Sequence, residues 1–258
     1  MYKVNWYTLC WNENDIVKYV IDYWKSIKNQ VDLQVIVYDN GSDDGCLNEL
    51  SKYDWIIIRH FDSNGFDDLT HQQIKNNCWK ESKGNSDYVI VTDFDEILWG
   101  NLQLALDNMK NNDCNILCTK WYAFCGDSVP TYTENKYLHQ LVKRGYKQYV
   151  NCDNDYLYYG KFMVIDPNKI DEINWIPGNH KCNPIPSKKV FISNDIIAFH
   201  INKGFGEEYF YNKRNYLSKR LSETNIRKKY GNEYLQTKQQ MFDEYRKYVK
   251  QSIDISNL

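Results

Sequence analysis

The 258-residue sequence lacks the short glycine motifs that mark the commonest nucleotide-binding and hydrolase folds. No G-x-G-x-x-G follows the first apolar run, so a dinucleotide site of that kind is not expected, and no G-x-x-x-x-G-K-[ST] is present to form a P-loop. No G-x-S-x-G is present to place a nucleophilic serine on the sharp turn of an α/β-hydrolase. These absences exclude three large classes of α/β enzyme.

The sequence also has no long apolar run, no signal segment and no closely paired cysteines. No stretch approaches the roughly 18 consecutive apolar residues that a membrane-spanning helix needs, and residues 1–7 contain no hydrophobic signal region. The eight cysteines are scattered without a C-x-x-C pair, which favours reduced thiols over a disulfide framework or a zinc site. We therefore expect a cytoplasmic protein.

The charges are balanced, because 32 Lys and Arg residues face 34 Asp and Glu residues. A net charge of −2 excludes the strongly basic character of a typical nucleic-acid binder, so no nucleic-acid partner is expected. The sequence is 42% hydrophobic and 16% aromatic, with 22 tyrosines, which excludes a disordered chain. This length suits a single α/β core.

The first 120 residues alternate apolar runs with helical patterns. Strands are expected at 3–9, 33–38, 55–58, 87–92 and 115–119, and helices at 16–27, 70–83 and 102–110. Short strands that are apolar on both faces and separated by helices indicate a parallel sheet with right-handed crossovers. The N-terminal half is therefore expected to be Rossmann-like, with a mostly parallel sheet flanked by helices.

After Trp121 the pattern loosens into polar and aromatic loops around further strands. These strands are expected at 138–143, 161–165, 189–192 and 196–200. From 207 to 250 the chain has a helical pattern in which Gly231 is the one strong breaker. We therefore expect C-terminal helices to follow the sheet.

Three polar clusters follow strands of the expected sheet, at 8–13, 39–45 and 93–96. The carboxyl ends of parallel strands meet at one edge of a sheet, and ligands of such folds bind at that edge. We therefore expect the three clusters to form one binding site.

The third cluster carries the clearest chemistry. The apolar run at 88–92 stops at Asp93-Phe94-Asp95, and residues two apart in an extended segment project to the same side. Two convergent carboxylates repel each other unless a cation lies between them. Mg²⁺ and Mn²⁺ take such oxygen ligands and usually share them with substrate phosphates. A nucleotide diphosphate held through a metal ion, without a glycine-rich loop, is thus the expected ligand.

Three segments together resemble the GT-A-fold glycosyltransferases of the family-2 type. They are T-L-C-W-N-E at 8–13, V-Y-D-N-G-S-D-D-G at 37–45 and V-T-D-F-D-E at 91–96. The resemblance implies that Thr8, Glu13 and Asp39 hold the base and ribose of a nucleotide. It also implies that Asp93 and Asp95 bind the metal on the diphosphate, so that Asp93 takes part in nucleotide binding as well.

The second half resembles one subgroup of these enzymes, in which Glu96 gives the motif a D-x-D-E ending. The segments Y-G-K-F-M-V-I-D-P at 159–167 and G-N-H at 178–180 are similar to that subgroup. By analogy His200 is a third metal ligand, and Lys203 steadies the departing diphosphate. An imidazole ligand favours Mn²⁺ over Mg²⁺. A hydrogen-bonded histidine and a surface lysine remain open as alternatives for these two residues.

The catalytic base carries no motif of its own. The resemblance implies an inverting enzyme, which needs a group that deprotonates the acceptor hydroxyl. Candidates are Asp153, Asp155 and His180, and Asp155 ranks first because the aromatic stretch at 156–159 follows it. Each of these residues has a surface position as its alternative.

The resemblance implies one GT-A-type domain over the whole of 1–258. Within it, 1–120 is expected to bind the nucleotide sugar and metal, 121–204 the acceptor, and 205–258 to form a helical segment. The donor is a nucleotide-diphosphate sugar, with a UDP-sugar favoured by resemblance, and the acceptor is a hydroxyl of a saccharide or a lipid-linked saccharide.

The aromatic and basic residues of the second half allow two interpretations each. The aromatic residues are concentrated at 121–160 and 205–216, where they either line an acceptor groove or pack in the core. The excess of Lys and Arg at 203–250 is either a solvated helix face or a peripheral contact with an anionic membrane.

Two other functions remain open at this point. A sugar nucleotidyltransferase shares parallel sheets and carboxylate-bound metals, but usually opens with a glycine-rich loop and a basic residue, which 8–13 lacks. A non-catalytic carbohydrate-binding relative would use the aromatic residues alone. His60, His71 and His139 are expected to be polar surface residues without a functional role.

Overall fold

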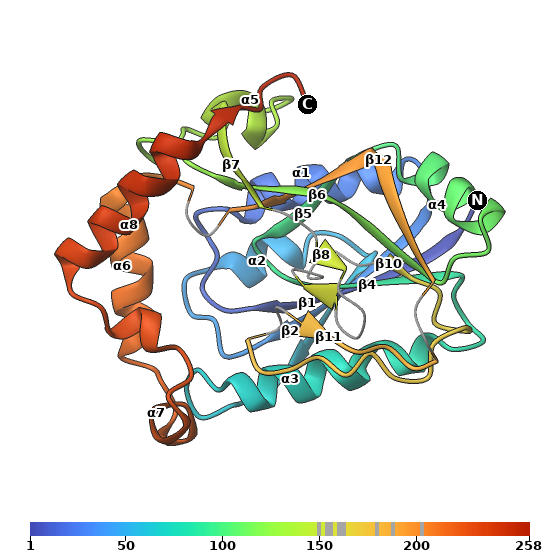
Figure 1. Cartoon of the computed structure of the whole chain (residues 1–258), viewed down its shortest axis with the longest axis horizontal. Coiled ribbons are helices and arrows are strands. Elements are labelled where there is room, and N and C mark those ends of the chain that lie inside the picture. Colours follow the sequence, from blue (N-terminus) through green and yellow to red (C-terminus); the bar gives the residue numbers. More distant parts are fainter. Residues whose placement is uncertain (149–150, 153–156, 159–163, 179–180, 187–188, 202–203) are drawn as a thin grey trace.

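The computed structural model describes residues 1–148, 151–152, 157–158, 164–178, 181–186, 189–201 and 204–258. Within these residues, ten strands form one sheet with the path β13-β7-β6-β10-β4-β1-β2-β3, and β12 joins it by pairing with β6 and β5. Helices lie on both faces of this sheet (Figure 1). The architecture is α/β, as the sequence predicts.

The five strands expected in the first 120 residues all run in the same direction. They are β1 (Lys3–Cys10), β2 (Asp32–Asp39), β3 (Ile56–His60), β4 (Tyr88–Asp93) and β6 (Ile116–Phe124). β1 pairs in parallel with β2 and β4, and β2 pairs in parallel with β3. β10 (Val164–Ile165) is antiparallel to both β4 and β6, so these two strands share a direction. The parallel order predicted for the first half is confirmed.

The segment 138–143 forms a helix, α5 (Leu138–Val142), and the prediction of a strand there is wrong. The Tyr137 N–H donates a hydrogen bond to Gln140 Oε1 at 3.0 Å, which caps the first turn. His139 points from this turn into the core and is buried. A short segment that is apolar on one side fits a helical turn as well as a strand, and here the cap favours the helix.

β12 (Val190–His200) is one long strand where the sequence predicted two. It pairs in parallel with β6 and shifts register between Ser193 and Ile197, in the region that separates the two predicted strands. It also pairs antiparallel with β5 (Glu96–Gly100), a strand that the sequence analysis missed. The carboxyl end of β12 therefore lies opposite the start of β5, directly after the Asp-Phe-Asp segment.

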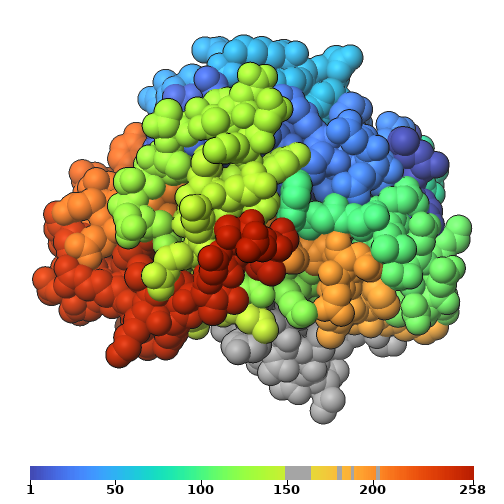
Figure 2. Space-filling model, turned by 90° about the horizontal axis from the view of Figure 1, so that it is seen from above, coloured from blue at the N-terminus to red at the C-terminus, as the bar shows by residue number. Residues whose placement is uncertain are grey.

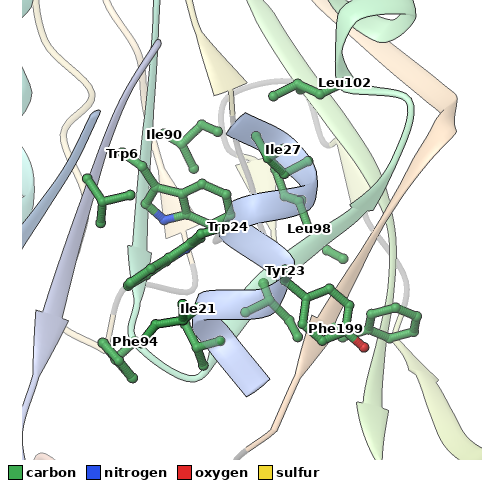
Figure 3. Close-up of a cluster of buried hydrophobic side chains, with 14 of the residues drawn as sticks. Trp6, Ile21, Tyr23, Trp24, Ile27, Ile90, Phe94, Leu98, Leu102 and Phe199 are labelled. Carbon is green, nitrogen blue, oxygen red and sulfur yellow. The ribbon is translucent and has the colours of Figure 1, made fainter. Parts of the chain in front are cut away.

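Side chains alternate between the two faces of β1, so that each face packs against its own helices. Trp6 packs with Trp24 in one buried cluster, with ring centroids 6.1 Å apart (Figure 3). Tyr7 lies in a second cluster with Trp79, which follows α3. The first cluster involves α1 (Val17–Lys28), α2 (Cys46–Leu50) and α4 (Leu102–Asn111), and the second lies beside α3 (Asp68–Asn77) and the 3-10 helix Cys78–Ser82.

The C-terminal helices stand beside the sheet as a layer of their own (Figure 1). They are α6 (Glu207–Ser218), α7 (Glu223–Lys228), the 3-10 helix η3 (Asn232–Leu235) and α8 (Lys238–Gln251). Phe210, Met241 and Tyr245 form a small buried cluster of α6 and α8. The helical pattern predicted at 207–250 is confirmed, including the break at Gly231, whose φ is +70°.

After α8 the chain returns to the sheet, because β13 (Ile253–Asp254) pairs antiparallel with β7 (Arg144–Gln148). Figure 2 shows this last segment on the surface against the part of the chain near β7. A separate three-stranded sheet contains β8 (Asn151–Cys152), β9 (Leu157–Tyr158) and β11 (Lys181–Cys182). In the parts of the chain that the structure describes, no helix is both long and apolar enough to cross a bilayer.

Candidate active site

A cavity of about 1030 Å³ opens where β1, β4 and β12 end. Its polar wall includes Glu13, Asp93, Asp95, His200 and Lys213. The first four are residues that the sequence predicted for the site, and the structure brings them to one cavity. The fifth comes from α6, so the C-terminal helices close this end of the sheet.

The Asp93 side of the cavity is held by a lysine from α3. Lys75 Nζ lies 2.5 Å from Asp93 Oδ1, and the Lys75 side chain is only 2% exposed. The Asp93 N–H donates a hydrogen bond to Glu96 Oε2 at 2.9 Å. A buried ammonium ion needs a charged partner, so this ion pair fixes the direction in which the Asp93 carboxylate points.

The Asp95 side of the cavity is held by cationic and imidazole groups from the second half of the chain. Asp95 Oδ2 lies 3.5 Å from His200 Nε2 and 3.5 Å from Lys213 Nζ, and its side chain is 10% exposed. Burial alone would raise the pKa of Asp95, but His200 and Lys213 hold this pKa well below its usual range. Asp95 is therefore an anion at neutral pH.

Glu13 shares the lysine that faces Asp95. Lys213 Nζ donates hydrogen bonds to both carboxylate oxygens of Glu13, each at 3.0 Å. Burial raises the pKa of Glu13 to about 7, an effect that Lys213 opposes and the negative charge of Asp95 reinforces. Burial would lower the pKa of Lys213, yet the carboxylates around it raise that pKa well above its usual value. The lysine therefore keeps its charge.

Asp39 and Thr8 lie behind the cavity wall. Asp39 is 1% exposed, and its carboxylate accepts hydrogen bonds from the Gly41 and Ser42 N–H groups at 3.1 Å. His60 Nδ1 lies 3.1 Å from the same carboxylate. Thr8 is fully buried within β1. Asp39 thus orders the turn after β2, whose residue Asn40 is the one that lines the cavity.

The first loop contributes an aromatic surface to the cavity. Trp11 stacks on Tyr216 with ring centroids 4.9 Å apart and an angle of 11° between the planes. Arg220 Cζ lies 3.6 Å from the centroid of the Trp11 ring, and Arg220 Nη2 donates to the Asn40 carbonyl at 3.4 Å. Tyr216 and Arg220 come from the end of α6 and the residues just after it, so this helix contacts the first loop as well as the acidic centre.

Further aromatic side chains line the cavity beside His200 and along β7 and α8. Trp121 stacks on the His200 ring with centroids 5.5 Å apart, and Tyr146 packs against Tyr248 at 5.0 Å. All three aromatic residues belong to the cavity wall, together with Tyr209 of α6. Aromatic faces beside a polar centre are suited to the apolar faces of sugar rings.

Asp95 and His200 fit a divalent transition metal in part. They offer a carboxylate oxygen and an imidazole nitrogen 3.5 Å apart, which is the donor chemistry that Mn²⁺ accepts. His200 Nδ1 is buried and has no hydrogen-bond partner within the described residues. No cluster of three or more His, Cys, Asp or Glu side chains suited to a metal occurs in the same residues. A metal here would need further ligands, such as phosphate oxygens.

Four predicted residues lie outside the described part of the chain. They are Asp153, Asp155, His180 and Lys203. The predictions of a catalytic base and of a lysine for the diphosphate therefore stay predictions.

The histidines reveal a further correction. His139 is 1% exposed and its Nδ1 lies 2.8 Å from Tyr23 Oη, so the prediction of a surface position is wrong. His71 lines the cavity and packs edge-on against Phe61 and Phe66. His60 faces Asp39. Hydropathy alone did not distinguish these environments, because it treats every histidine as a polar residue.

The sequence analysis missed Lys75 and Lys213 as individual site residues. Lys75 precedes Cys78 and Trp79 by three and four positions, a spacing that places it on the buried side of the helix. Lys213 gave no comparable signal, because it is one of many basic residues in the C-terminal segment. Only the packing of α6 over the first loop reveals its position.

The chain matches one family of known proteins and has similarity to several solved structures. The family model described as Glycosyl transferase family 2 matches residues 7–172. No curated protein matches the chain by sequence. Among solved structures, S. aureus TarS 1-349 is 13% identical, with 95% of this chain and 70% of that chain covered and a TM-score of 0.47. The mannosyltransferase PcManGT from Pyrobaculum calidifontis, in complex with GDP-Man and Mn²⁺, is 10% identical, with coverages of 96% and 74% and a TM-score of 0.46.

Because the family model spans more than half of the chain, the protein belongs to glycosyl transferase family 2 and is a nucleotide-sugar glycosyltransferase.

Proposed function

We propose that the enzyme transfers a sugar from a nucleotide-diphosphate sugar to a hydroxyl group of a saccharide or lipid-linked acceptor, with inversion and with Mn²⁺ as the cofactor. The observation that carries this proposal is the convergence of Asp95, His200 and Lys213 in the cavity at the strand ends. A carboxylate, an imidazole and an ammonium group at one point suit a ligand that carries both a metal and a phosphate.

The donor end of the cavity has groups for each part of a nucleotide diphosphate. Trp11, Tyr216 and Arg220 form a flat, cationic stack beside which a nucleobase would lie. Asp95 and His200 would hold the metal, which neutralises charge on the leaving diphosphate when it is bound. Lys213 and Lys75 add positive charge from the protein itself, which stabilises the same developing charge. We propose uridine as the nucleoside of the donor.

The acceptor would lie against the aromatic wall that contains Trp121, Tyr146 and Tyr248. Sugar rings stack on such side chains, while the tyrosine hydroxyls hydrogen-bond to sugar hydroxyls. We keep Asp155, followed by Asp153 and His180, as candidates for the base that deprotonates the acceptor. In this proposal 1–120 binds the donor and 121–204 the acceptor.

The C-terminal segment 205–258 then has two roles in our proposal. Its helix α6 closes the donor site through Lys213, as the contacts with Glu13 and Asp95 indicate. Its exposed basic residues, such as Arg227 and Lys228 at the end of α7, make a peripheral contact with an anionic membrane if the acceptor is lipid-linked. Vesicle co-sedimentation measures that contact independently of the reaction.

The test is a thermal-shift measurement with Mn²⁺ and with UDP or GDP, alone and together. We expect the melting temperature to rise most with metal and nucleotide together, because ligands that bind the folded state stabilise it. Asp95→Ala should abolish this gain. A hydrolysis screen of sugar nucleotides with Mn²⁺ then identifies the donor sugar from its slow cleavage. No shift with any nucleotide would exclude the proposal, and glycan binding that survives loss of Asp93 and Asp95 would favour a non-catalytic relative.

A further inference from the structure

Lys213 lies between two carboxylates of the cavity that come from different loops. Its Nζ is 3.0 Å from both oxygens of Glu13 and 3.5 Å from Asp95 Oδ2. Asp95 Oδ2 is also the atom that lies 3.5 Å from His200 Nε2. The ammonium group therefore occupies the cationic position of this acidic centre.

The backbone that carries Lys213 is held firmly from the other side of α6. The neighbouring residue Arg214 forms a two-point ion pair with Glu244 of α8, at 2.7 and 3.2 Å. Phe210, one turn earlier, is buried between Met241 and Tyr245. The helix is thus anchored, whereas the lysine side chain is 22% exposed and ends in a flexible four-carbon stem. The charge can move although the helix stays in place.

A divalent cation and Lys213 would compete for the same carboxylate. Any metal that takes Asp95 Oδ2 as a ligand has to share that atom with the ammonium group beside it. A metal ion bound to Asp95 Oδ2 and the ammonium group of Lys213 beside it repel each other strongly, because the site is mostly closed to water. A diphosphate relieves the conflict, because it brings negative charge that can take over the lysine.

We propose that Lys213 is a displaceable counter-cation that couples the binding of the divalent metal to that of the nucleotide diphosphate. This inference rests on the proposed function, because it assumes that the site takes both ligands. Without nucleotide, Lys213 forms ion pairs with Glu13 and Asp95 and keeps the affinity for metal low. With nucleotide, Lys213 moves to the phosphates and leaves Asp95 to the metal, so each ligand strengthens the binding of the other.

The contrast with Lys75 supports a movable role for Lys213. Lys75 is 2% exposed, and its ion pair with Asp93 is 2.5 Å long. Lys213 is more exposed, and its ammonium group is divided between Glu13 and Asp95 at longer distances. A lysine that two carboxylates share at longer distances gives up one partner more easily than a lysine in a single short ion pair.

The experiment measures the affinity of the full chain for Mn²⁺ by electron paramagnetic resonance, without nucleotide and with saturating UDP or GDP. We expect nucleotide to tighten Mn²⁺ binding by at least about tenfold in the wild type, the usual scale of such couplings. In Lys213→Gln, Mn²⁺ alone should bind about tenfold more tightly, and the gain from nucleotide should fall below about threefold. Lys213→Arg keeps the charge and should retain most of the coupling.

The matched control is Lys219→Gln, which removes an exposed positive charge at the end of the same helix and should leave both affinities unchanged. If Lys213→Gln fails to fold, Glu13→Gln provides the second variant, because Lys213 then has Asp95 as its remaining carboxylate and Mn²⁺ alone should bind about threefold more weakly. Unchanged coupling in Lys213→Gln, or unchanged Mn²⁺ affinity in Glu13→Gln, overturns the inference about Lys213. The proposed function still stands in that case, provided that the wild type binds nucleotide. A wild type that binds no nucleotide overturns the proposed function itself.

Discussion

Asp93 and Asp95 are separated by one residue, yet each faces a lysine from a different part of the chain. Asp93 pairs with Lys75 of α3, which belongs to the N-terminal half that the strand and helix pattern already predicts. Asp95 faces Lys213 of α6, from the C-terminal layer. On the Asp93 side, one buried lysine holds a carboxylate that is 30% exposed, whereas on the Asp95 side a lysine that is 22% exposed is shared by two carboxylates that are 11% and 10% exposed. The two carboxylates of one motif therefore have different environments and, we expect, different importance.

The largest expected difference concerns catalysis. Asp95→Asn removes the charge that faces both His200 and Lys213, and should lower kcat/KM for sugar transfer about 10³-fold, or about 4 kcal/mol in barrier. Asp93→Asn should cost about tenfold, because Lys75 already neutralises that carboxylate. Steady-state kinetics with the donor identified by the hydrolysis screen measures both values. Equal losses in the two variants would show that the motif acts as one symmetric unit.

A smaller difference is expected in stability. Lys75→Met leaves Asp93 without the cation that holds it and should lower the free energy of unfolding by about 3 kcal/mol, as expected when one partner of a buried ion pair is removed. Lys213→Met should lower it by about 1 kcal/mol or less, because Glu13, whose pKa is raised to about 7, can take up a proton and Asp95 keeps His200 as a partner. Urea unfolding of both variants at pH 7.5 provides the comparison. A greater loss for Lys213→Met would contradict the assignment of the stronger ion pair to Lys75 of α3.

The pH dependence of stability should separate the two sides further. Burial lowers the pKa of His71, on the α3 side, from 6.5 to about 4. The unfolded chain then binds a proton below pH 6.5 that the folded chain does not bind until about pH 4. This residue therefore reduces the free energy of unfolding by about 2 kcal/mol as the pH falls through that range. In His71→Gln, the free energy of unfolding in urea should fall less between pH 7.5 and pH 4.5 than in the wild type, and the difference should equal this amount.

Glu13, on the α6 side, should show an effect of similar size and opposite sign. Its pKa is raised to about 7 from 4.5, so the folded chain binds this proton more tightly than the unfolded chain. The resulting stability is complete below pH 4.5 and is lost as the pH rises towards 7. Glu13→Gln should remove roughly 2–3 kcal/mol of this loss when unfolding at pH 4.5 and 7.5 is compared. The same slope in the variant and the wild type would refute this assignment.

The sequence predicts the parallel half of the fold because local signals suffice there. β1, β2 and β4 are apolar on both faces, and the helices between them have clear periodicity. The two-residue strand β10 is too short for such a signal, although it pairs with both β4 and β6. α5 was mistaken for a strand, because five residues cannot distinguish the two periods. The secondary structure of these short segments depends on contacts with residues far away in the chain.

The candidate site follows the same division. The sequence predicts Glu13, Asp93 and Asp95 as site residues from their position after strands. It predicts His200 from the family resemblance. It does not predict Lys213, because no sequence pattern distinguishes one lysine from the other basic residues of the same helix. It also named Asp39 and Thr8, which the structure places behind the wall. A motif indicates where a ligand binds, while tertiary packing determines which side chains reach it.

The ion pair of Glu13 and Lys213 has a consequence for synthesis, because 200 positions separate its partners along the chain. At about 5–20 residues per second, a ribosome needs about 10–40 s to add the lysine after the glutamate. During that time β1, β2 and β4 can already assemble, with two acids at their ends that still lack this cation. The acidic centre therefore reaches its final charge balance only when α6 has been made.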